Sequence, residues 1–280
     1  MSGSEIWDDA YSNAKYIPSG NNYPELWARI AADFRSAMLA ESHASLDVTY
    51  GPHERNRYDL FHPGEPAKGL VVFVHGGYWL DFDKSFWSWL AKGPTSLGWT
   101  VAMPSYSLAP NVRLREITLE IAQAIEKMAE DSIGPIRLVG HSAGGHLITR
   151  MICDDSPLSR AAVTRIDRCV TISGLHDLRP LLKTSMNEQL RLDNLEADQE
   201  SPALHFPVSD TSVVCRVGAN ERPEFLRQSQ LLFDNWQERA AEITMDIVPG
   251  AHHFNIIEDL AAPESSLTRY LTRIETRIEQ

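Results

Sequence analysis

Short apolar runs alternate along this chain with longer segments in which apolar residues recur every three to four positions. Residues 70–74 are apolar at every position, which is typical of a strand buried on both faces of a parallel sheet. Further short runs lie at 99–103, 136–139, 169–172, 213–217 and 243–248. Residues 114–131 instead carry an apolar face of helical period: Ile117, Ile121, Ile125 and Met128. Strands that alternate with helices predict an α/β fold with a doubly wound, mostly parallel sheet.

The flanking segments complete this pattern. Residues 44–50 and 58–62 predict a hairpin of edge strands around a turn near Gly51. The polar residues 1–22 are expected to wrap the surface. Further helices are predicted at 23–39, between the strands at 70–74 and 99–103, and at 146–153, 223–239 and 267–278. In the first of these, the predicted inward face consists of Leu26, Ile30, Phe34 and Met38, extended by Trp27.

One irregular segment interrupts the alternation. Residues 175–207 are largely polar and contain three prolines, Pro180, Pro202 and Pro207. We expect this segment to form a short lid over the carboxyl end of the sheet, where ligands bind in open α/β folds. No linker or repeat divides the sequence, so residues 1–280 are expected to form a single domain.

Composition narrows the class of protein. The net charge is −12 and the isoelectric point is about 5.3, which argue against a nucleic-acid partner. Three scattered cysteines, Cys153, Cys169 and Cys215, suggest reduced core residues, not disulfides or a metal cluster. The N-terminal residues lack an apolar secretory signal, and no apolar run is long enough to span a membrane. We therefore expect a cytoplasmic protein without a membrane partner; the oligomeric state, including a homodimer, stays open.

The main candidate for chemistry is the sequence Gly140-His-Ser142-Ala-Gly144, between the apolar run 136–139 and a predicted helix. A strand, a G-x-S-x-G turn and a helix form the nucleophile elbow of serine hydrolases. The glycines leave room for a strained turn, and the helix N-terminus favours negative charge beside the serine. Ser142 is therefore the predicted nucleophile.

A serine nucleophile requires a histidine base. Of the ten histidines, His252 and His253 follow the last predicted strand, at the carboxyl edge of the sheet. This position matches the chain order nucleophile, acid, histidine of the α/β-hydrolase fold. We favour His253 over His252 as the base.

The base requires an acid that fixes its tautomer. Glu221 lies in the loop after the strand at 213–217, one strand ahead of the histidine pair. Asp177, after the preceding strand, is the second candidate. Glu224 is a weaker one, because the first turn of a helix favours a carboxylate for other reasons.

The segment His75-Gly-Gly-Tyr-Trp79 follows the first buried strand and predicts an oxyanion hole. Its expected donors are the backbone N–H groups of Gly77 and Tyr78, together with that of Ala143 after the nucleophile. Trp79 is expected to line an apolar substrate pocket. The nearby aromatic residues Phe86, Trp87 and Trp89 are more readily explained as packing of a helix. His75 is expected to brace the loop.

No sequence motif indicates a metal or an organic cofactor, and none is expected. The motifs as a set resemble kynurenine formamidases, a group of α/β-hydrolases of the esterase/lipase type. The resemblance rests on these segments from about Tyr50 onward: 75–79 (HGGYW), 140–147 (GHSAGGHL), 173–178 (SGLHDL), 223–229 (PEFLRQS) and 253–254 (HF). It implies a triad of Ser142, Glu221 and His253, although the subfamily usually carries an aspartate where this chain has Glu221.

The resemblance also implies the substrate, an aryl formamide such as N-formylkynurenine, cleaved through an acyl-enzyme. A carboxylesterase acting on short acyl esters would use the same residues, so the motifs alone do not separate these two activities. A non-catalytic ligand-binding protein of the hydrolase fold is the alternative from another class. All three residues of a triad are present in the sequence, which favours an enzyme.

Overall fold

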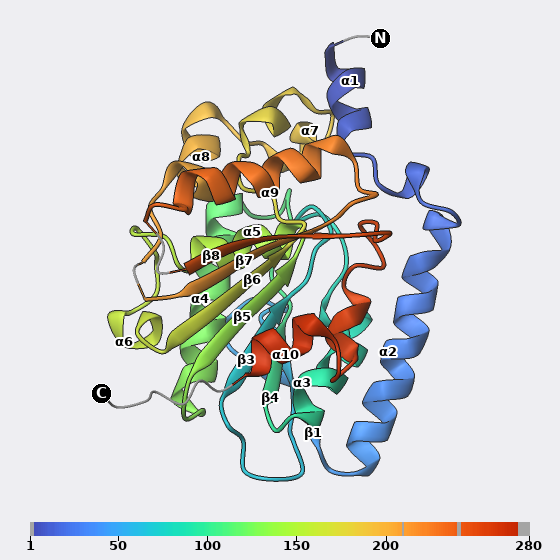
Figure 1. The fold of residues 1–280 in the computed structure, drawn as a ribbon, viewed down its shortest axis with the longest axis vertical. Coiled ribbons are helices and arrows are strands. Elements are labelled where there is room, and N and C mark those ends of the chain that lie inside the picture. Colours follow the sequence, from blue (N-terminus) through green and yellow to red (C-terminus); the bar gives the residue numbers. More distant parts are fainter. Residues whose placement is uncertain (1–2, 209, 240–241, 274–280) are drawn as a thin grey trace.

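The computed structural model describes residues 3–208, 210–239 and 242–273. In this part of the chain eight strands form one sheet in the order β1-β2-β4-β3-β5-β6-β7-β8 (Figure 1). Among these strands β2 alone runs opposite to the common direction of the others, which confirms the predicted mostly parallel α/β sheet. The strands are β1 (Ala44–Thr49), β2 (Arg57–Phe61), β3 (Leu70–Val74), β4 (Thr100–Pro104), β5 (Ile136–His141), β6 (Ile166–Ile172), β7 (Ser212–Gly218) and β8 (Glu242–Val248).

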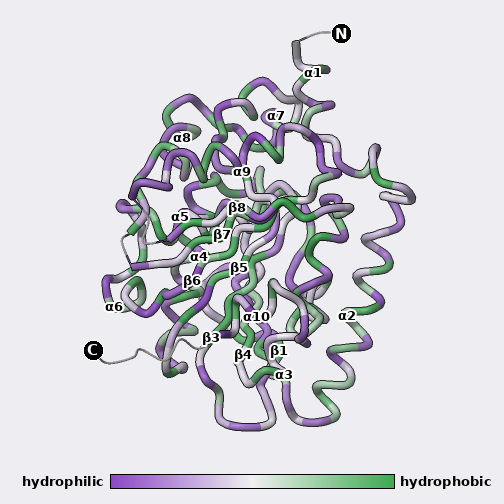
Figure 2. Tube along the Cα trace, viewed as in Figure 1, coloured by the Kyte–Doolittle hydropathy of each residue, from purple (hydrophilic) through white to green (hydrophobic). Residues whose placement is uncertain are grey.

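The central strands bury both faces, as their continuous apolar runs predict. Along β3, Val72 and Val74 belong to one hydrophobic core, and Val71 and Phe73 belong to a second core on the opposite face. Alternate side chains of a strand point to opposite faces, so a strand between two helical layers must be apolar throughout. Figure 2 shows this as hydrophobic colouring along the middle of the sheet.

Helices cover the two faces. The first core receives side chains from α4 (Leu114–Glu130), α5 (Ala143–Arg150) and α9 (Pro223–Trp236). The second core receives side chains from α2 (Tyr23–Ala40) and α10 (Ser266–Thr272). Helix α10 starts where the sequence predicts it, but residues 274–278 of the predicted helix lie outside the described residues.

Two helix predictions differ from the structure. The single helix expected between β3 and β4 is divided into η3 (Lys84–Phe86), η4 (Ser88–Ala91) and α3 (Lys92–Ser96). In α2, Trp27 and Ala31 are buried, whereas Leu26 and Ile30 of the predicted inward face are more than one-third exposed. The buried face of α2 is rotated from the predicted one toward Trp27, because the Trp27 ring packs 4.6 Å from the Trp87 ring. Helical periodicity alone does not reveal this contact.

The N-terminal residues are more ordered than their polar composition suggested. They form α1 (Gly3–Ala10), η1 (Ala14–Tyr16) and η2 (Gly20–Asn22) before α2 begins. Tyr11 and Ile17 are buried, so this segment is part of the packed structure.

Residues 175–207 contain η5 (Arg179–Lys183), α7 (Asn187–Leu190), α8 (Asn194–Gln199) and η6 (Pro202–Leu204). Leu175, Leu178 and Leu181 anchor this segment in the first core. The three cysteines are buried and unpaired, as expected for reduced core residues. No helix in the described residues has the length and apolar character needed to cross a membrane.

Candidate active site

Ser142 stands between β5 and α5 with φ 55° and ψ −118°, a strained backbone conformation for a residue other than glycine. The neighbouring glycines make this turn sterically possible. A Cβ atom on Gly140 would lie 2.3 Å from the Gly144 carbonyl oxygen, and one on Gly144 would lie 1.9 Å from the Val74 carbonyl oxygen. The first glycine therefore lets α5 begin close to the end of β5, and the second lets the elbow pack closely against the end of β3.

Glu221 and His253 are brought together from the loops that follow β7 and β8. The Glu221 Oε2 atom lies 2.6 Å from Nδ1 of His253, and the Glu221 side chain has no exposed surface. The other carboxylate oxygen, Oε1, accepts hydrogen bonds from Ser173 Oγ at 2.5 Å and from the Gly218 N–H at 2.8 Å. These contacts fix the carboxylate and engage Nδ1 of His253, so the other ring nitrogen, Nε2, is not used by Glu221.

His141, inside the elbow motif, is a supporting residue that the sequence analysis did not single out. Its Nε2–H donates to the backbone carbonyl of His253 at 2.9 Å, and the two rings are 4.6 Å apart. Burial, with a smaller contribution from His253, lowers the pKa of His141 well below its usual value. His141 is therefore neutral at pH 7 and connects the loop of His253 to the end of β5, directly before Ser142.

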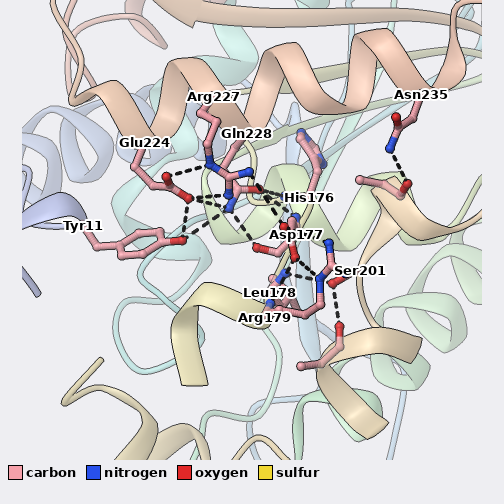
Figure 3. A network of polar contacts seen from close by, with 12 residues as sticks. Tyr11, His176, Asp177, Leu178, Arg179, Ser201, Glu224, Arg227, Gln228 and Asn235 are labelled. Atoms are coloured by element: carbon pink, nitrogen blue, oxygen red, sulfur yellow. Dashed lines mark hydrogen bonds and ion pairs between the residues drawn. The ribbon is translucent and has the colours of Figure 1, made fainter. Parts of the chain in front are cut away.

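The alternative acids have other partners. Asp177 accepts hydrogen bonds from the guanidinium of Arg179 at 2.8 and 3.2 Å, and it lies beside Gln228 of α9 (Figure 3). Glu224 pairs with Arg227 and accepts the Tyr11 hydroxyl at 2.8 Å. Neither carboxylate is bonded to His253.

His252, the alternative base, is also engaged elsewhere. Its Nδ1 accepts the backbone N–H groups of Phe254 and Asn255, and its Nε2 lies 3.3 Å from the Tyr23 hydroxyl. It is not among the residues that line the pocket beside Ser142. Burial lowers the pKa of His252.

The predicted oxyanion loop runs directly alongside Ser142. A Cβ atom on Gly76 would lie 2.9 Å from Cβ of Ser142. The next three residues, Gly77, Tyr78 and Trp79, all have positive φ, at 114°, 52° and 59°. This turn reverses the chain and closes with hydrogen bonds from the N–H groups of Leu80 and Asp81 to the Gly77 carbonyl.

Ala143 and His75 occupy the positions expected around this loop. Ala143 is the first residue of α5, so its N–H is among the helix donors without a partner in the helix. The His75 ring stacks on the Tyr106 ring at 4.4 Å, and its Nδ1–H donates to the Gly76 carbonyl at 2.7 Å. His75 thus braces the loop.

A pocket of about 360 Å³ opens on Ser142 and His253. Aromatic side chains form much of its wall: Tyr11, Trp27, Tyr78, Phe82, Trp87 and Phe254. Trp79, the aromatic residue predicted for this wall, is not one of them. The left-handed turn points its indole into the first core, where it is fully buried and meets the His146 ring edge-on at 5.1 Å. Trp87, for which the sequence favoured a packing role, contacts both the pocket and the core.

The N-terminal segment and the start of α2 supply six further residues of the wall: Ser12, Asn13, Ala14, Gly20, Asn21 and Pro24. No residue of 175–207, the segment expected to form a lid, lines this pocket. The N-terminal contribution to the wall has no motif or periodicity of its own, because it depends on a long-range contact between residues 11–13 and the predicted oxyanion loop. Aromatic residues recur among small polar ones at Tyr11, Tyr16, Tyr23 and Trp27, which is a weak local signal of this contribution.

Potential metal ligands lie elsewhere. Within the described part of the chain, three side chains could share an ion: Asp154, Asp155 and His205. None of them lines the pocket, and Asp155 is already engaged by both terminal nitrogens of Arg150 at 2.7 and 3.0 Å.

The fold, the strained serine turn and the acid and histidine loops after β7 and β8 define the class of protein. The chain belongs to the α/β-hydrolase family, whose model matches residues 71–205. It is a hydrolase of the esterase type that is related to kynurenine formamidases. The kynurenine formamidase of Salmo salar is 30% identical over 240 residues, which cover 82% of this chain and 81% of the relative. That of Danio rerio is 28% identical over 275 residues and covers 94% of both chains.

Two solved structures of similar proteins have the same α/β-hydrolase fold. A protein of Silicibacter sp. TM1040, for which a thioesterase activity has been suggested, superposes with a TM-score of 0.88 and 47% identity over 95% of this chain and 98% of that protein. Esterase B of Lactobacillus rhamnosis shares the fold, with a TM-score of 0.65 and 18% identity over 90% of this chain and 92% of its own.

Proposed function

We propose that this protein is a serine hydrolase that cleaves an aryl formamide such as N-formylkynurenine. The observation that carries the proposal is the hydrogen bond of 2.6 Å between Glu221 and His253, because the His253 side chain lines the same pocket as Ser142. The relation to kynurenine formamidases over most of the chain favours the formamide as substrate. The products would be formate and the free arylamine.

In the proposed mechanism His253 removes the hydroxyl proton of Ser142 while the Ser142 oxygen adds to the formyl carbon. The carboxylate of Glu221 stabilises the imidazolium that forms. The same proton then passes to the leaving amine nitrogen as the C–N bond breaks, which releases the arylamine. Water, deprotonated by His253, attacks the formyl-enzyme, and formate leaves as Ser142 regains its proton.

The backbone N–H groups of Gly77, Tyr78 and Ala143 are the proposed oxyanion donors. Their position beside Ser142, in a turn of fixed shape, would stabilise negative charge on the carbonyl oxygen without rearrangement during the reaction. The aromatic wall of the pocket supports an aryl substrate, because rings such as Trp27 and Phe254 offer flat apolar surface to it.

A carboxylesterase is the second candidate. The mechanism would be the same, and the solved structures that share the fold include esterases. A thioester is a further substrate to test, because a thioesterase activity has been suggested for the Silicibacter protein. A formamide, an ester and a thioester would all react through an acyl-enzyme.

Steady-state kinetics on one preparation would separate these activities. We expect the ratio kcat/KM for N-formylkynurenine to exceed that for p-nitrophenyl acetate and for an acetyl thioester. The Ser142→Ala variant, prepared in parallel, controls for contaminating esterases. A higher kcat/KM for the ester would favour the carboxylesterase. Binding of the formamide without turnover of any substrate would support the non-catalytic alternative.

A further inference from the structure

The hydroxyl group of Tyr78 connects the predicted oxyanion loop to the N-terminal segment. It donates a hydrogen bond to the backbone carbonyl of Tyr11 at 2.6 Å and accepts one from Nδ2 of Asn13 at 3.2 Å. Both partners lie far earlier in the chain, before α2 begins. The Asn13 side chain is buried, although the segment around it is polar.

The backbone of Tyr78 requires such an attachment. A residue with a side chain costs about 1 kcal/mol or more in the left-handed region, and here Tyr78 and Trp79 adopt it in succession. Strained residues keep their conformation only when surrounding contacts hold them. Trp79 is held by the core and by the hydrogen bond from the Ala109 N–H to its carbonyl. Tyr78 lies at the pocket, and its hydroxyl is held by the N-terminal segment.

The N-terminal segment is also bonded to the start of α9, close to Glu221. The Tyr11 hydroxyl donates to Glu224 at 2.8 Å, and Gln228 Nε2 contacts the same two groups at 3.3 and 3.0 Å (Figure 3). Glu224 is in the first turn of α9, three residues after Glu221. Tyr11 therefore links α9, the helix that begins directly after the Glu221 loop, to the loop that carries the proposed oxyanion donors.

We propose that the Tyr78 hydroxyl, held between Asn13 and the Tyr11 carbonyl, is a positioning element that aligns the backbone donors of the oxyanion hole. The inference rests on the proposed serine-hydrolase function. It assigns the N-terminal segment a part in transition-state stabilisation in addition to its place in the pocket wall. Loss of the hydroxyl would loosen the turn that holds the backbone donors. Because the oxyanion forms only in the tetrahedral state, this change should raise the free energy of that state more than it weakens substrate binding.

The Tyr78→Phe variant tests this, and the chain offers a closely matched control. Tyr50 also donates to a backbone carbonyl at 2.6 Å, that of Ser105, and accepts from an asparagine Nδ2 at 3.2 Å, that of Asn56. It does not line the pocket. Tyr50→Phe therefore removes the same pair of hydrogen bonds away from the oxyanion loop.

For Tyr78→Phe we expect kcat to fall about tenfold to fiftyfold with KM within threefold, because a misaligned donor costs less than a deleted one. Asn13→Ala, which removes one of the two bonds, should give a smaller fall of the same kind. Tyr50→Phe should lower the melting temperature but keep kcat. Rates are measured with p-nitrophenyl acetate as well as with the formamide, so that failure of the formamide as substrate leaves the comparison intact.

A pair of ligands separates alignment from general damage. Trifluoroacetophenone accepts the Ser142 oxygen at its carbonyl carbon, and its carbonyl oxygen becomes the oxyanion as the serine proton moves to His253. Acetophenone has the same aryl group but forms no such adduct readily. For Tyr78→Phe we expect the inhibition constant of trifluoroacetophenone to rise by the same factor by which kcat falls. The inhibition constant of acetophenone should stay within twofold of its value for the parent protein.

Two outcomes would overturn the inference. If Tyr78→Phe keeps kcat and loses only thermal stability, as Tyr50→Phe does, the hydroxyl is purely structural. If the affinity for both ketones falls by the same factor, the substitution has deformed the aryl pocket and not displaced the oxyanion donors. Either result leaves the serine-hydrolase proposal intact, whereas absence of hydrolysis by the unaltered protein would remove that proposal.

Discussion

Replacing Glu221 by glutamine tests the arrangement on which the proposed chemistry depends. The carbonyl oxygen of the introduced amide can still accept from Ser173 and Gly218, as the carboxylate does now at 2.5 and 2.8 Å. The amide NH₂ group then faces His253 Nδ1 and donates to it. This favours the tautomer with the proton on Nε2, which cannot accept a proton from Ser142.

The size of the effect follows from charge and distance. The Glu221 carboxylate has no exposed surface, and its oxygen lies 2.6 Å from the imidazole nitrogen. With the charge centres about 4 Å apart, an effective dielectric constant of about 20 gives about 4 kcal/mol of attraction to the imidazolium. Loss of that attraction corresponds to about a thousandfold lower kcat, and the wrong tautomer adds to it. We therefore expect a fall of about 10³ to 10⁴.

The assay is kcat at saturating substrate, with thermal unfolding of each variant as the check on folding. Glu221→Asp keeps the charge on a side chain one methylene shorter, and it should retain more activity than Glu221→Gln. Asp177→Asn, which alters the Arg179 pair, should keep kcat near that of the parent. A folded Glu221→Gln protein within tenfold of the parent rate would refute the role of Glu221.

Three further predictions use the same preparation. Ser142→Ala should keep the melting temperature within a few degrees and lower kcat by several orders of magnitude; a rate near that of the parent in clean protein would exclude the nucleophile. His253→Ala should be nearly as damaging as Ser142→Ala, and His252→Ala much milder; reversed effects would move the base to His252. Burial lowers the pKa of His146 and of His176 to about 3, so between about pH 6.5 and 3 the unfolded chain binds more protons. Stability in urea should therefore fall from about pH 7.5 to about pH 5, by about 2 kcal/mol for each of these histidines; a constant free energy of unfolding would contradict this.

The sheet and the candidate residues of the site could be inferred from local sequence. A strand between two helical layers must be apolar on both faces, so β3 can be recognised from its uninterrupted run of apolar residues, and its neighbours from similar runs. The elbow at Ser142 was recognisable because its steric demands exclude side chains at fixed spacing on both sides. Glu221 and His253 were reached by topology, since loops after successive parallel strands meet at one edge of the sheet.

The wall of the pocket was decided only by tertiary structure. Whether Trp79 faces the substrate or the core depends on the backbone of a three-residue turn, and two successive left-handed residues direct it to the core. The orientation of α2 depends on Trp27 meeting Trp87, which lies far along the chain beyond three strands of the sheet. The contact of Asn13 and Tyr11 with Tyr78 joins the chain start to the oxyanion loop. Local periodicity reports which residues are buried within one element, but such contacts between distant elements arise from the packing of the whole chain.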